Sequence, residues 1–527
     1  MVLYDTKDAI LTNIAQRFEK RLKVPVDVTL KIDDRLGEYD GAIKDGVISA
    51  GSYGQLLDTA GRFLRNPAIE NGTFHSFKEM SGMYFATHNK NFMDDAPIDA
   101  VCEYIDDLAF WGMNVFNLWF DLHDYRSMDE GKEQVNRLKK MIAHANSIGV
   151  KVVMTSLGNE AFKDSPEHLR ADWTGGHDGY TKDLCDHYHV EICPSKPGGM
   201  EQIKQYRREM LEAFKDVTID YLATGAYDEG GCTCSACAPW GGNGYLRCCE
   251  EMISLYKEYF PNIEVIIGLW GVSRFRNDDD EFIEIQKAFD EGRLSACKYF
   301  NYELMDDSDY PFKTGLPRPL LGFPEISMRC AWPWGGYGAN PMPKFLDEMW
   351  QNASPYTAGG YPYSEGIYED INKVIMLRKY RDNQKAEDTI REYLTYEFGI
   401  TGAMLDKAAK AVMDMEETLE RGLDRPNHRY PIYHPEKAEA IEQAMQEVSD
   451  SLPESVRESV KWQVLYLRAK IDGELVRNDC RRNDKVKTYF KKLIRVSQIE
   501  DGHECIMPDA EEYEEGRFTW VKLFCKD

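Results

Sequence analysis

Apolar and polar residues alternate along the middle of the chain in a way that predicts a regular succession of strands and helices. From Ser81 onward, short apolar runs typical of buried strands are followed by longer segments whose apolar residues recur at helical spacing. Eight such units predict an α/β fold built on a closed (β/α)₈ barrel, the TIM barrel. The alternative is an open doubly wound sheet, which usually has fewer strands and an early Gly-rich phosphate loop, absent from this sequence. The predicted strands are 83–87, 114–120, 150–156, 219–224, 263–269, 296–302, 320–328 and 356–360.

The two ends of the chain have different patterns. Before the barrel, two helical segments, 8–22 and 51–66, accompany short strand-like segments. After Asn372 the apolar spacing is helical over several segments. We therefore expect a small N-terminal α/β domain in residues 1–77, a catalytic barrel in residues 78–372 and a mainly helical C-terminal domain in residues 373–527.

Composition and charge restrict the partners of the chain. Of its 527 residues, 43% are hydrophobic and 29% charged, and the formal net charge is −26. This acidity argues against nucleic acid and anionic membranes as partners, because both bind basic patches. No apolar run approaches the roughly 20 residues that a membrane span requires. The sequence starts without a secretory signal and its 13 cysteines are scattered, so we expect a cytoplasmic protein with reduced thiols and allow for a homo-oligomer.

One stretch, Ile219–Trp240, concentrates the candidate chemistry. Its predicted strand, the fourth, is followed by the adjacent acids Asp228 and Glu229 and by a pair of glycines. Carboxylates at the carboxyl end of a parallel strand lie where barrel enzymes place their reacting groups. Burial at this strand end would raise the pKa of Glu229, as a general acid requires. The alternative is a solvated acidic loop.

The ends of the other predicted strands add further carboxylates and aromatic rings. Aromatic rings suit the C–H faces of sugars, and carboxylates suit acid, base and hydroxyl contacts, so the pattern predicts a carbohydrate substrate. Core packing is the alternative for each ring, and we favour it for Trp111 and Trp350. Glu303 and Glu325 are candidate bases. The candidate substrate-binding residues are His88, Asn89, Trp119, Asp121, His123, Trp240, Trp270, Tyr302, Arg329, Trp332, Trp334, Tyr363 and Glu365.

Two enzyme families share features with these residues. The segment GAYDEGG, residues 225–231, resembles the Gly-x-Asp-Glu signature of the β-N-acetylhexosaminidases of glycoside hydrolase family 20. That resemblance implies an exo-acting enzyme with Glu229 as general acid and Asp228 orienting a 2-acetamido group. The domain order resembles the α-glucuronidases of family 67, which implies inversion with Glu303 or Glu325 as base. Residues 114–119 are similar to the second strand of both families.

Other classes of function remain open alternatives. A non-catalytic carbohydrate-binding barrel would keep the aromatic rings but lose the acid, and the presence of Glu229 argues against it. A metal-dependent lyase or isomerase would need a histidine and carboxylate ligand set, for which His88, His123 and Glu160 are candidates.

Three cysteines follow the acid pair with the spacing C-x-C-x-x-C. Cys232, Cys234 and Cys237 match the spacing of zinc ligands, and Cys193 is our first choice for a fourth because it precedes the helix leading into the same strand. We expect a structural zinc that braces the loop carrying Glu229, and no organic cofactor. A loop of free thiols and a disulfide are the alternatives. Other candidates for the fourth ligand are Cys185, His187, Cys248 and Cys249.

Overall fold

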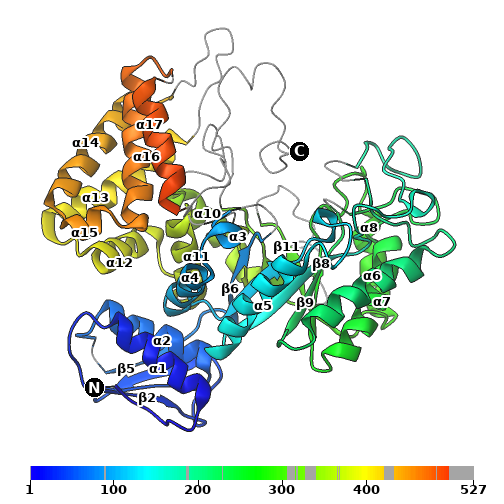
Figure 1. Ribbon diagram of the computed structural model, residues 1–527, viewed down its shortest axis with the longest axis horizontal. Helices are drawn as coiled ribbons and strands as arrows, with labels where there is room; N and C mark the ends of the chain where they lie inside the picture. Colours follow the sequence, from blue (N-terminus) through cyan, green and yellow to red (C-terminus); the bar gives the residue numbers. More distant parts are fainter. Residues whose placement is uncertain are drawn as a thin grey trace.

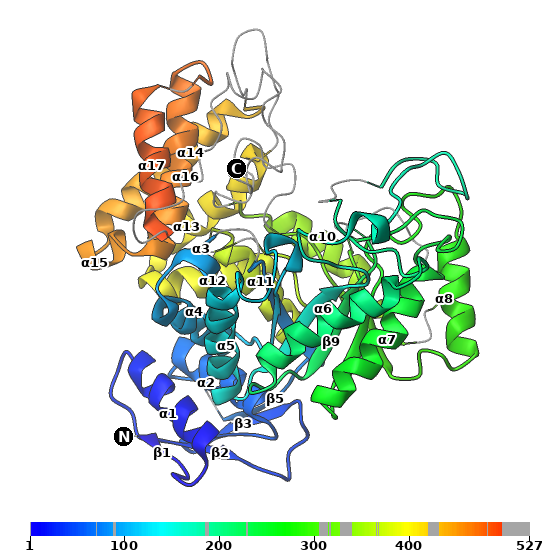
Figure 2. The same cartoon turned by 45° about the vertical axis from the view of Figure 1, so that its right-hand side comes forward.

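The chain forms three regions in the computed structural model (Figure 1). An α/β domain lies below the barrel, and a group of helices lies above it and to the left, in both Figures 1 and 2. In the described part of the chain, no helix is long and apolar enough to cross a membrane. The structure describes residues 2–69, 71–87, 91–184, 189–227, 230–304, 315, 318–326, 340–364, 366, 368–419, 432–481 and 483–497.

The N-terminal region is a five-stranded sheet with two helices packed on it. The strand order is β1-β2-β4-β3-β5, with β3 antiparallel to both of its neighbours. Each helix begins at a capping side chain: Asp8 accepts a hydrogen bond from the backbone N–H of Leu11, and Ser52 from that of Gln55. The elements are β1 (Val2–Leu3), α1 (Ala9–Arg21), β2 (Val28–Ile32), β3 (Asp40–Lys44), β4 (Val47–Ala50), α2 (Tyr53–Arg65) and β5 (Gly72–His75).

The middle of the chain closes into the predicted barrel. Eight parallel strands pair in the order β6 to β13, and β13 pairs with β6. The strands are β6 (Met80–Phe85), β7 (Val115–Trp119), β8 (Lys151–Leu157), β9 (Tyr221–Gly225), β10 (Glu264–Gly268), β11 (Cys297–Tyr302), β12 (Leu320–Gly322) and β13 (Thr357–Gly360). The connecting helices are α3 (Phe92–Asp95), α4 (Ile98–Phe110), α5 (Lys132–Ser147), α6 (Gly199–Phe214), α7 (Gly244–Tyr259), α8 (Asp280–Asp290), α10 (Pro343–Ala353) and α11 (Asp370–Asp382).

Alternate residues of the barrel strands belong to two separate apolar clusters. Val153 and Tyr221 belong to the smaller cluster, whereas their chain neighbours Val152 and Leu222 belong to the large cluster that includes the helices. Because successive side chains of a strand point to opposite faces, the smaller cluster fills the barrel and the larger one packs the helices around it. Burial on both faces explains why the strands are mostly apolar in the sequence.

The N-terminal domain packs against the amino ends of the barrel strands. A small pocket between them is lined by Tyr39 and Gln55 from the domain and by Tyr221 and Tyr299 from the first residues of barrel strands. Arg381 of α11 donates a hydrogen bond to the Gln55 side chain at 2.9 Å. The domain therefore covers the amino end of the barrel.

The described part of the C-terminal region is helical, as predicted. Its helices are α12 (Ala386–Phe398), α13 (Gly402–Asp414), α14 (Pro435–Ser451), α15 (Glu454–Arg457), α16 (Val460–Arg477) and α17 (Asp484–Ser497). The predicted boundary at 372/373 falls inside α11, which packs on the barrel, and the three domain limits stay predictions.

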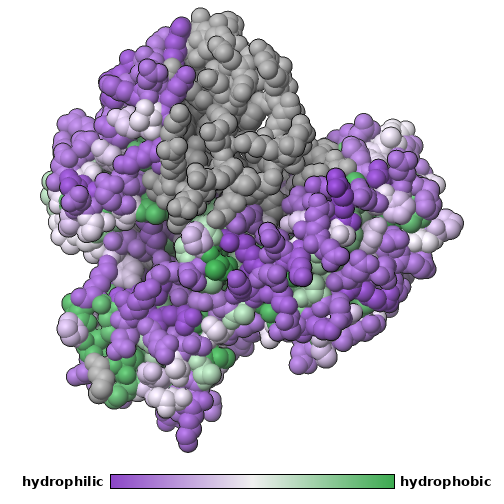
Figure 3. Space-filling view, viewed as in Figure 1, coloured by the Kyte–Doolittle hydropathy of each residue, from purple (hydrophilic) through white to green (hydrophobic). Residues whose placement is uncertain are grey.

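The surface in Figure 3 is mostly hydrophilic, as expected for an acidic chain. Apolar residues gather over the N-terminal domain at the lower left of that view. Leu3 and Val24 are among the exposed apolar side chains of this domain.

Candidate functional site at the carboxyl end of the barrel

The candidate site is organised around the residues that follow β9. We call residues 226–227 and 230–241 the strand-four loop, since β9 is the fourth barrel strand. Asp228 and Glu229 lie between its two parts and outside the described residues. The same holds for six predicted substrate contacts: His88, Asn89, Arg329, Trp332, Trp334 and Glu365. The structure therefore describes the residues on both sides of the acid pair.

Asn159 fixes the backbone immediately after the acid pair. Its side chain follows β8, is fully buried, and accepts a hydrogen bond from the Gly231 N–H at 2.9 Å. It also donates to the carbonyl oxygens of Gly231 at 2.9 Å and Ile192 at 3.0 Å. Gly231 has φ +123°, and a Cβ there would lie 2.7 Å from a methyl carbon of Leu184. Glycine is thus required at this turn, and Asn159 holds it from the neighbouring strand.

Trp240 holds the other side of the same loop. Its indole N–H donates to the Ala226 carbonyl at 2.5 Å, and its backbone N–H donates to the Tyr180 hydroxyl at 2.7 Å. We expected Trp240 to contact substrate, but its side chain is fully buried. In this position the indole supports the end of β9 and presents no open face to a ligand.

Glu281 of α8 forms hydrogen bonds with both parts of the strand-four loop. It accepts hydrogen bonds from the Tyr227 hydroxyl and from the Gly241 N–H, the latter at 2.7 Å. Burial raises the pKa of Glu281. Tyr227, which directly precedes Asp228, makes one of these buried hydrogen bonds. Gly230, which directly follows Glu229, is bonded in the chain to Gly231, whose backbone N–H donates to Asn159.

A buried carboxylate, Glu160, joins the ends of β7 and β8. One carboxylate oxygen accepts hydrogen bonds from the Trp119 indole at 3.1 Å and the Leu122 N–H at 2.8 Å. The other pairs with the Arg207 guanidinium of α6 at 3.0 Å. Trp119, Glu160 and Arg207 are all buried, so the predicted sugar-binding ring Trp119 serves here in a closed network.

His123 connects this network to two further carboxylates. Its Nδ1 lies 2.8 Å from Asp121 and its Nε2 lies 3.4 Å from Glu191. Burial alone would lower the pKa of His123, but the negative charges of Asp121, Glu191 and Glu160 raise it to about 9. Asp121 and His123, both predicted substrate contacts, are 3% and 1% exposed.

Asp121, His123 and Glu160 are also close enough together to be considered as ligands of a catalytic metal. Ligand atoms of Asp121, His123 and Glu160 lie within 4.8 Å of one another. However, Arg207 already supplies a positive charge to Glu160 and His123 supplies one to Asp121. The geometry therefore favours an internal ion-pair network over a metal centre with an open coordination position.

The remaining described candidates follow β10 to β13. Tyr302 ends β11 and is buried, and Glu303 after it is half-buried. Glu325 is also half-buried and forms an isolated parallel bridge with Tyr363. The ring of Tyr363 stacks on Tyr84, with centroids 5.4 Å apart. These residues lie together at the carboxyl ends of their strands.

Trp270 is the second residue after β10 and is half-buried, with the Arg274 guanidinium carbon 5.3 Å from its ring centroid. It remains a predicted substrate contact.

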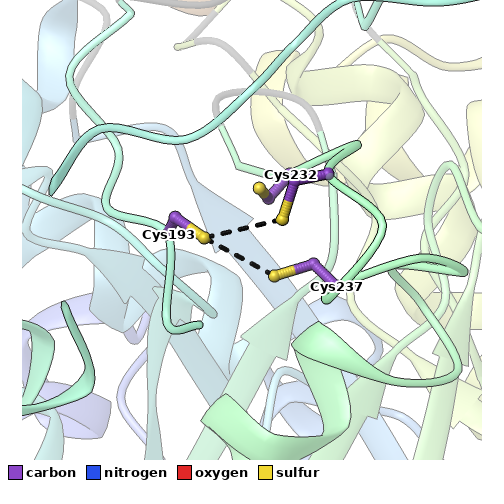
Figure 4. A group of neighbouring side chains, drawn as sticks. Cys193, Cys232 and Cys237 are labelled. Atoms are coloured by element: carbon purple, nitrogen blue, oxygen red, sulfur yellow. Dashed lines mark hydrogen bonds between the residues drawn. The ribbon is translucent and has the colours of Figure 1, made fainter. Parts of the chain in front are cut away.

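The four predicted metal ligands come together in space. The sulfur atoms of Cys193, Cys232, Cys234 and Cys237 all lie within 4.8 Å of one another. Cys193 points toward Cys232 and Cys237, which come from another segment of the chain (Figure 4). Hydrogen bonds from the Cys232 and Cys237 thiols lower the pKa of Cys193.

Four buried residues that contact the candidate site residues were not identified from the sequence. Tyr180, Glu191, Arg207 and Glu281 were not among the candidates. Arg207 gave a detectable signal, because it lies on the apolar face of its helix, four residues after Ile203. A charged residue in such a stripe indicates a buried ion pair.

The fold is similar to that of solved glycoside hydrolases. A family 89 glycoside hydrolase from Clostridium perfringens, in complex with its substrate GlcNAc-alpha-1,4-galactose, has a TM-score of 0.62 at 12% identity, covering 93% of this chain and 64% of that chain. A family 138 enzyme targeting pectin rhamnogalacturonan II has a TM-score of 0.56 at 10% identity, covering 94% and 72%. The structure of CpGH84B has a TM-score of 0.51 at 10% identity, covering 93% and 90%.

These likenesses establish the fold class, the (β/α)₈ barrel of such hydrolases. The chain spans 64% and 65% of the length of the first two family 89 structures that it matches. A family 20 structure from Vibrio harveyi has a lower TM-score of 0.49. The specific resemblances to families 20 and 67 stay predictions. No protein-family model and no curated protein matches the sequence.

Proposed function

We propose that the chain is a glycoside hydrolase in which Glu229 acts as general acid. The observation that carries the proposal is the place of the acid pair in the sequence, which begins three residues after the end of the fourth strand of a closed parallel barrel, between segments held by buried hydrogen bonds. The carboxyl ends of barrel strands are where such folds carry their reacting groups. Similarity in fold to several glycoside hydrolases supports the assignment.

The substrate class that we propose is a glycoside with a 2-acetamido group, cleaved from the end of a chain. The local sequence Asp228-Glu229 motivates it. The family 89 neighbour, which acts on a GlcNAc-containing substrate, gives further support. Our sequence-based expectation is a β-linked sugar, whereas that neighbour's substrate is α-linked, so both anomers belong in the test.

The proposed chemistry needs no carboxylate nucleophile. Glu229 donates its proton to the glycosidic oxygen as the bond to the anomeric carbon breaks. The acetamide carbonyl oxygen attacks that carbon, while Asp228 accepts a hydrogen bond from the amide N–H. Water then attacks the anomeric carbon from the side of the departed group and gives one proton to Glu229, while the bond from that carbon to the acetamide oxygen breaks and the acetamide re-forms, so the configuration is retained.

A second mechanism inverts the configuration with Glu303 or Glu325 as base. Both side chains are half-buried at the carboxyl ends of β11 and β12, where water can reach them. In this case the carboxyl groups of acid and base would lie about 6.5–9.5 Å apart, with water between them. An NMR time course of the anomeric proton separates the two mechanisms, because only the acetamide route gives retention and inhibition by a thiazoline analogue.

The decisive experiment compares Glu229→Gln with wild type on aryl and alkyl 2-acetamido glycosides of both anomers. We expect kcat to fall by at least about 10²-fold with a poor leaving group and much less with an activated aryl group, which needs no protonation. Glu258→Gln, an exposed carboxylate on α7, is the matched control and should keep wild-type activity. Unchanged turnover of the alkyl glycoside by Glu229→Gln would exclude this acid.

A screen of binding separates the enzyme from a non-catalytic carbohydrate-binding barrel. Tight sugar binding by the wild-type chain without any hydrolysis would favour that class.

Equal cleavage rates for sugars that lack the 2-acetamido group would rule out the acetamide route and leave the inverting mechanism.

A further inference from the structure

We propose that Cys193, Cys232, Cys234 and Cys237 bind one zinc ion and that this ion ties the connection after β8 to the strand-four loop. The site is separate from the sugar chemistry, and its existence does not depend on the proposed function. Cys193 lies at the end of the long connection that leads into α6, whereas the other three cysteines lie between β9 and α7.

The distances between sulfur atoms fit a tetrahedral site. The sulfur of Cys193 lies 3.8 Å from that of Cys234 and 3.7 Å from that of Cys237. With zinc–sulfur bonds of about 2.3 Å, the edge of a regular tetrahedron of four sulfur atoms is about 3.8 Å. A disulfide would instead bring two sulfur atoms to about 2.05 Å. The arrangement therefore matches four ligands around one centre better than any pair of bonded sulfurs.

Groups that can donate hydrogen bonds to sulfur surround the cluster. The backbone N–H of Asp172 lies 3.4 Å from the Cys232 sulfur, and the Ser195 hydroxyl lies 3.0 Å from the Cys237 sulfur. The Arg247 guanidinium lies 3.8 Å from the same Cys237 sulfur. Zinc with four thiolates carries a net charge of −2, and outer donors of this kind disperse such a charge. A set of neutral thiols would not need them.

The type of site indicates its role. Four sulfur ligands leave no open coordination position, and Cys193, Cys232 and Cys237 are buried. The ion would therefore act structurally and would not activate water. Cys232 is the third residue after Glu229, so the cross-link would hold the chain close to the proposed acid, together with Asn159 and Trp240.

Metal analysis of the full chain, purified without a polyhistidine tag, tests the proposal directly. We expect about one zinc per chain, and the zinc K-edge absorption spectrum should show four sulfur neighbours at about 2.3 Å. Cys234→Ser should bind less than one zinc per chain. The control is Cys480→Ser, which also changes a half-buried free cysteine and should keep the full zinc content.

The structural role is measured by hydrogen exchange in the strand-four loop. Removal of zinc by a chelator should speed exchange in residues 230–241 and leave the N-terminal sheet unchanged, which a sugar-cleavage assay alone could not show. If Cys234→Ser does not fold, the absorption spectrum of the wild-type chain still decides. Metal-free protein with intact loop protection, a disulfide between any two of the four cysteines, or a site filled by iron would overturn the proposal. None of these outcomes bears on whether Glu229 cleaves sugars.

Discussion

Asn159 offers the most direct test of how the residues around the acid pair are held. The Asn159→Ala variant removes one acceptor and two donors from a fully buried position. It leaves the N–H and carbonyl of Gly231, and the carbonyl of Ile192, without their side-chain partner. Alanine fits sterically, so the change removes hydrogen bonds without adding a clash.

The magnitude follows from these lost hydrogen bonds. An unpaired buried polar group costs about 1–3 kcal/mol, and water entering the space left by the amide recovers part of that cost. For three affected backbone groups we expect the free energy of unfolding to fall by about 3–5 kcal/mol. Because Gly231 lies two residues after Glu229, a displacement of about 1 Å would also lower kcat by about 10²-fold.

The assay combines urea unfolding, followed by fluorescence, with steady-state kinetics on an aryl 2-acetamido glycoside. The control variant is Asn71→Ala, which loses two similar hydrogen bonds to Asp45 at the surface and should change stability by less than about 1 kcal/mol. Asn159→Ala should lower kcat more than it raises KM. Wild-type stability and wild-type kcat in Asn159→Ala would refute the idea that this side chain holds the loop.

Two further predictions concern the buried ion-pair network. His123, with its pKa raised to about 9, contributes stability that is complete below its ordinary pKa of about 6.5 and is lost as the pH rises through 9; His123→Gln should remove this loss, worth about 3 kcal/mol, from the curve of Tm against pH. Arg207→Met leaves Glu160 without its cation and should lower the free energy of unfolding in urea by about 3–5 kcal/mol, with recovery in the double variant that adds Glu160→Gln. The exposed pair of Arg391 with Asp406 is its control, and Arg391→Met should cost no more than about 1 kcal/mol.

The barrel could be predicted because its strands carry a strong local signal. All five residues of Val115–Trp119 are buried and four of them are apolar, so the strand is a mostly apolar run with burial on both faces. The strands β3 and β5 of the N-terminal domain carry no such signal. Both strands are short. In β3, buried residues alternate with half-buried or exposed ones, and in β5, half-buried residues alternate with exposed ones. Their pairing depends on the neighbouring strand, which a local pattern does not contain.

The seventh strand shows the same limit in the barrel itself. The apolar run predicted a strand over 320–328, whereas β12 covers Leu320–Gly322. Pro324 cannot donate a hydrogen bond to a neighbouring strand, and it stands just beyond the end of β12. The position of that proline was a usable signal for an earlier end.

The cysteine cluster could be assembled from the sequence because three of its members are local. The fourth, Cys193, required only the argument that it precedes the helix leading into β9. The role of Trp240 could not be predicted in the same way. A tryptophan among glycines and prolines looks exposed in the sequence, but a tertiary contact, its indole N–H with the Ala226 carbonyl, decides that it is buried.

The described residues around the acid pair all restrict the motion of the same short loop. A general acid acts only when its proton lies within hydrogen-bond reach of the leaving oxygen, and a loop with adjacent glycines has little stiffness of its own. Stiffness must then come from the surroundings. Here Asn159 reaches in from the residues after β8, Trp240 and Glu281 hold the other side, and the zinc that we propose at the cysteine cluster would fix the continuation of the loop. Because these supports act on one short segment, their removal in pairs should cost less than the sum of the single changes, since a loop already released loses little more.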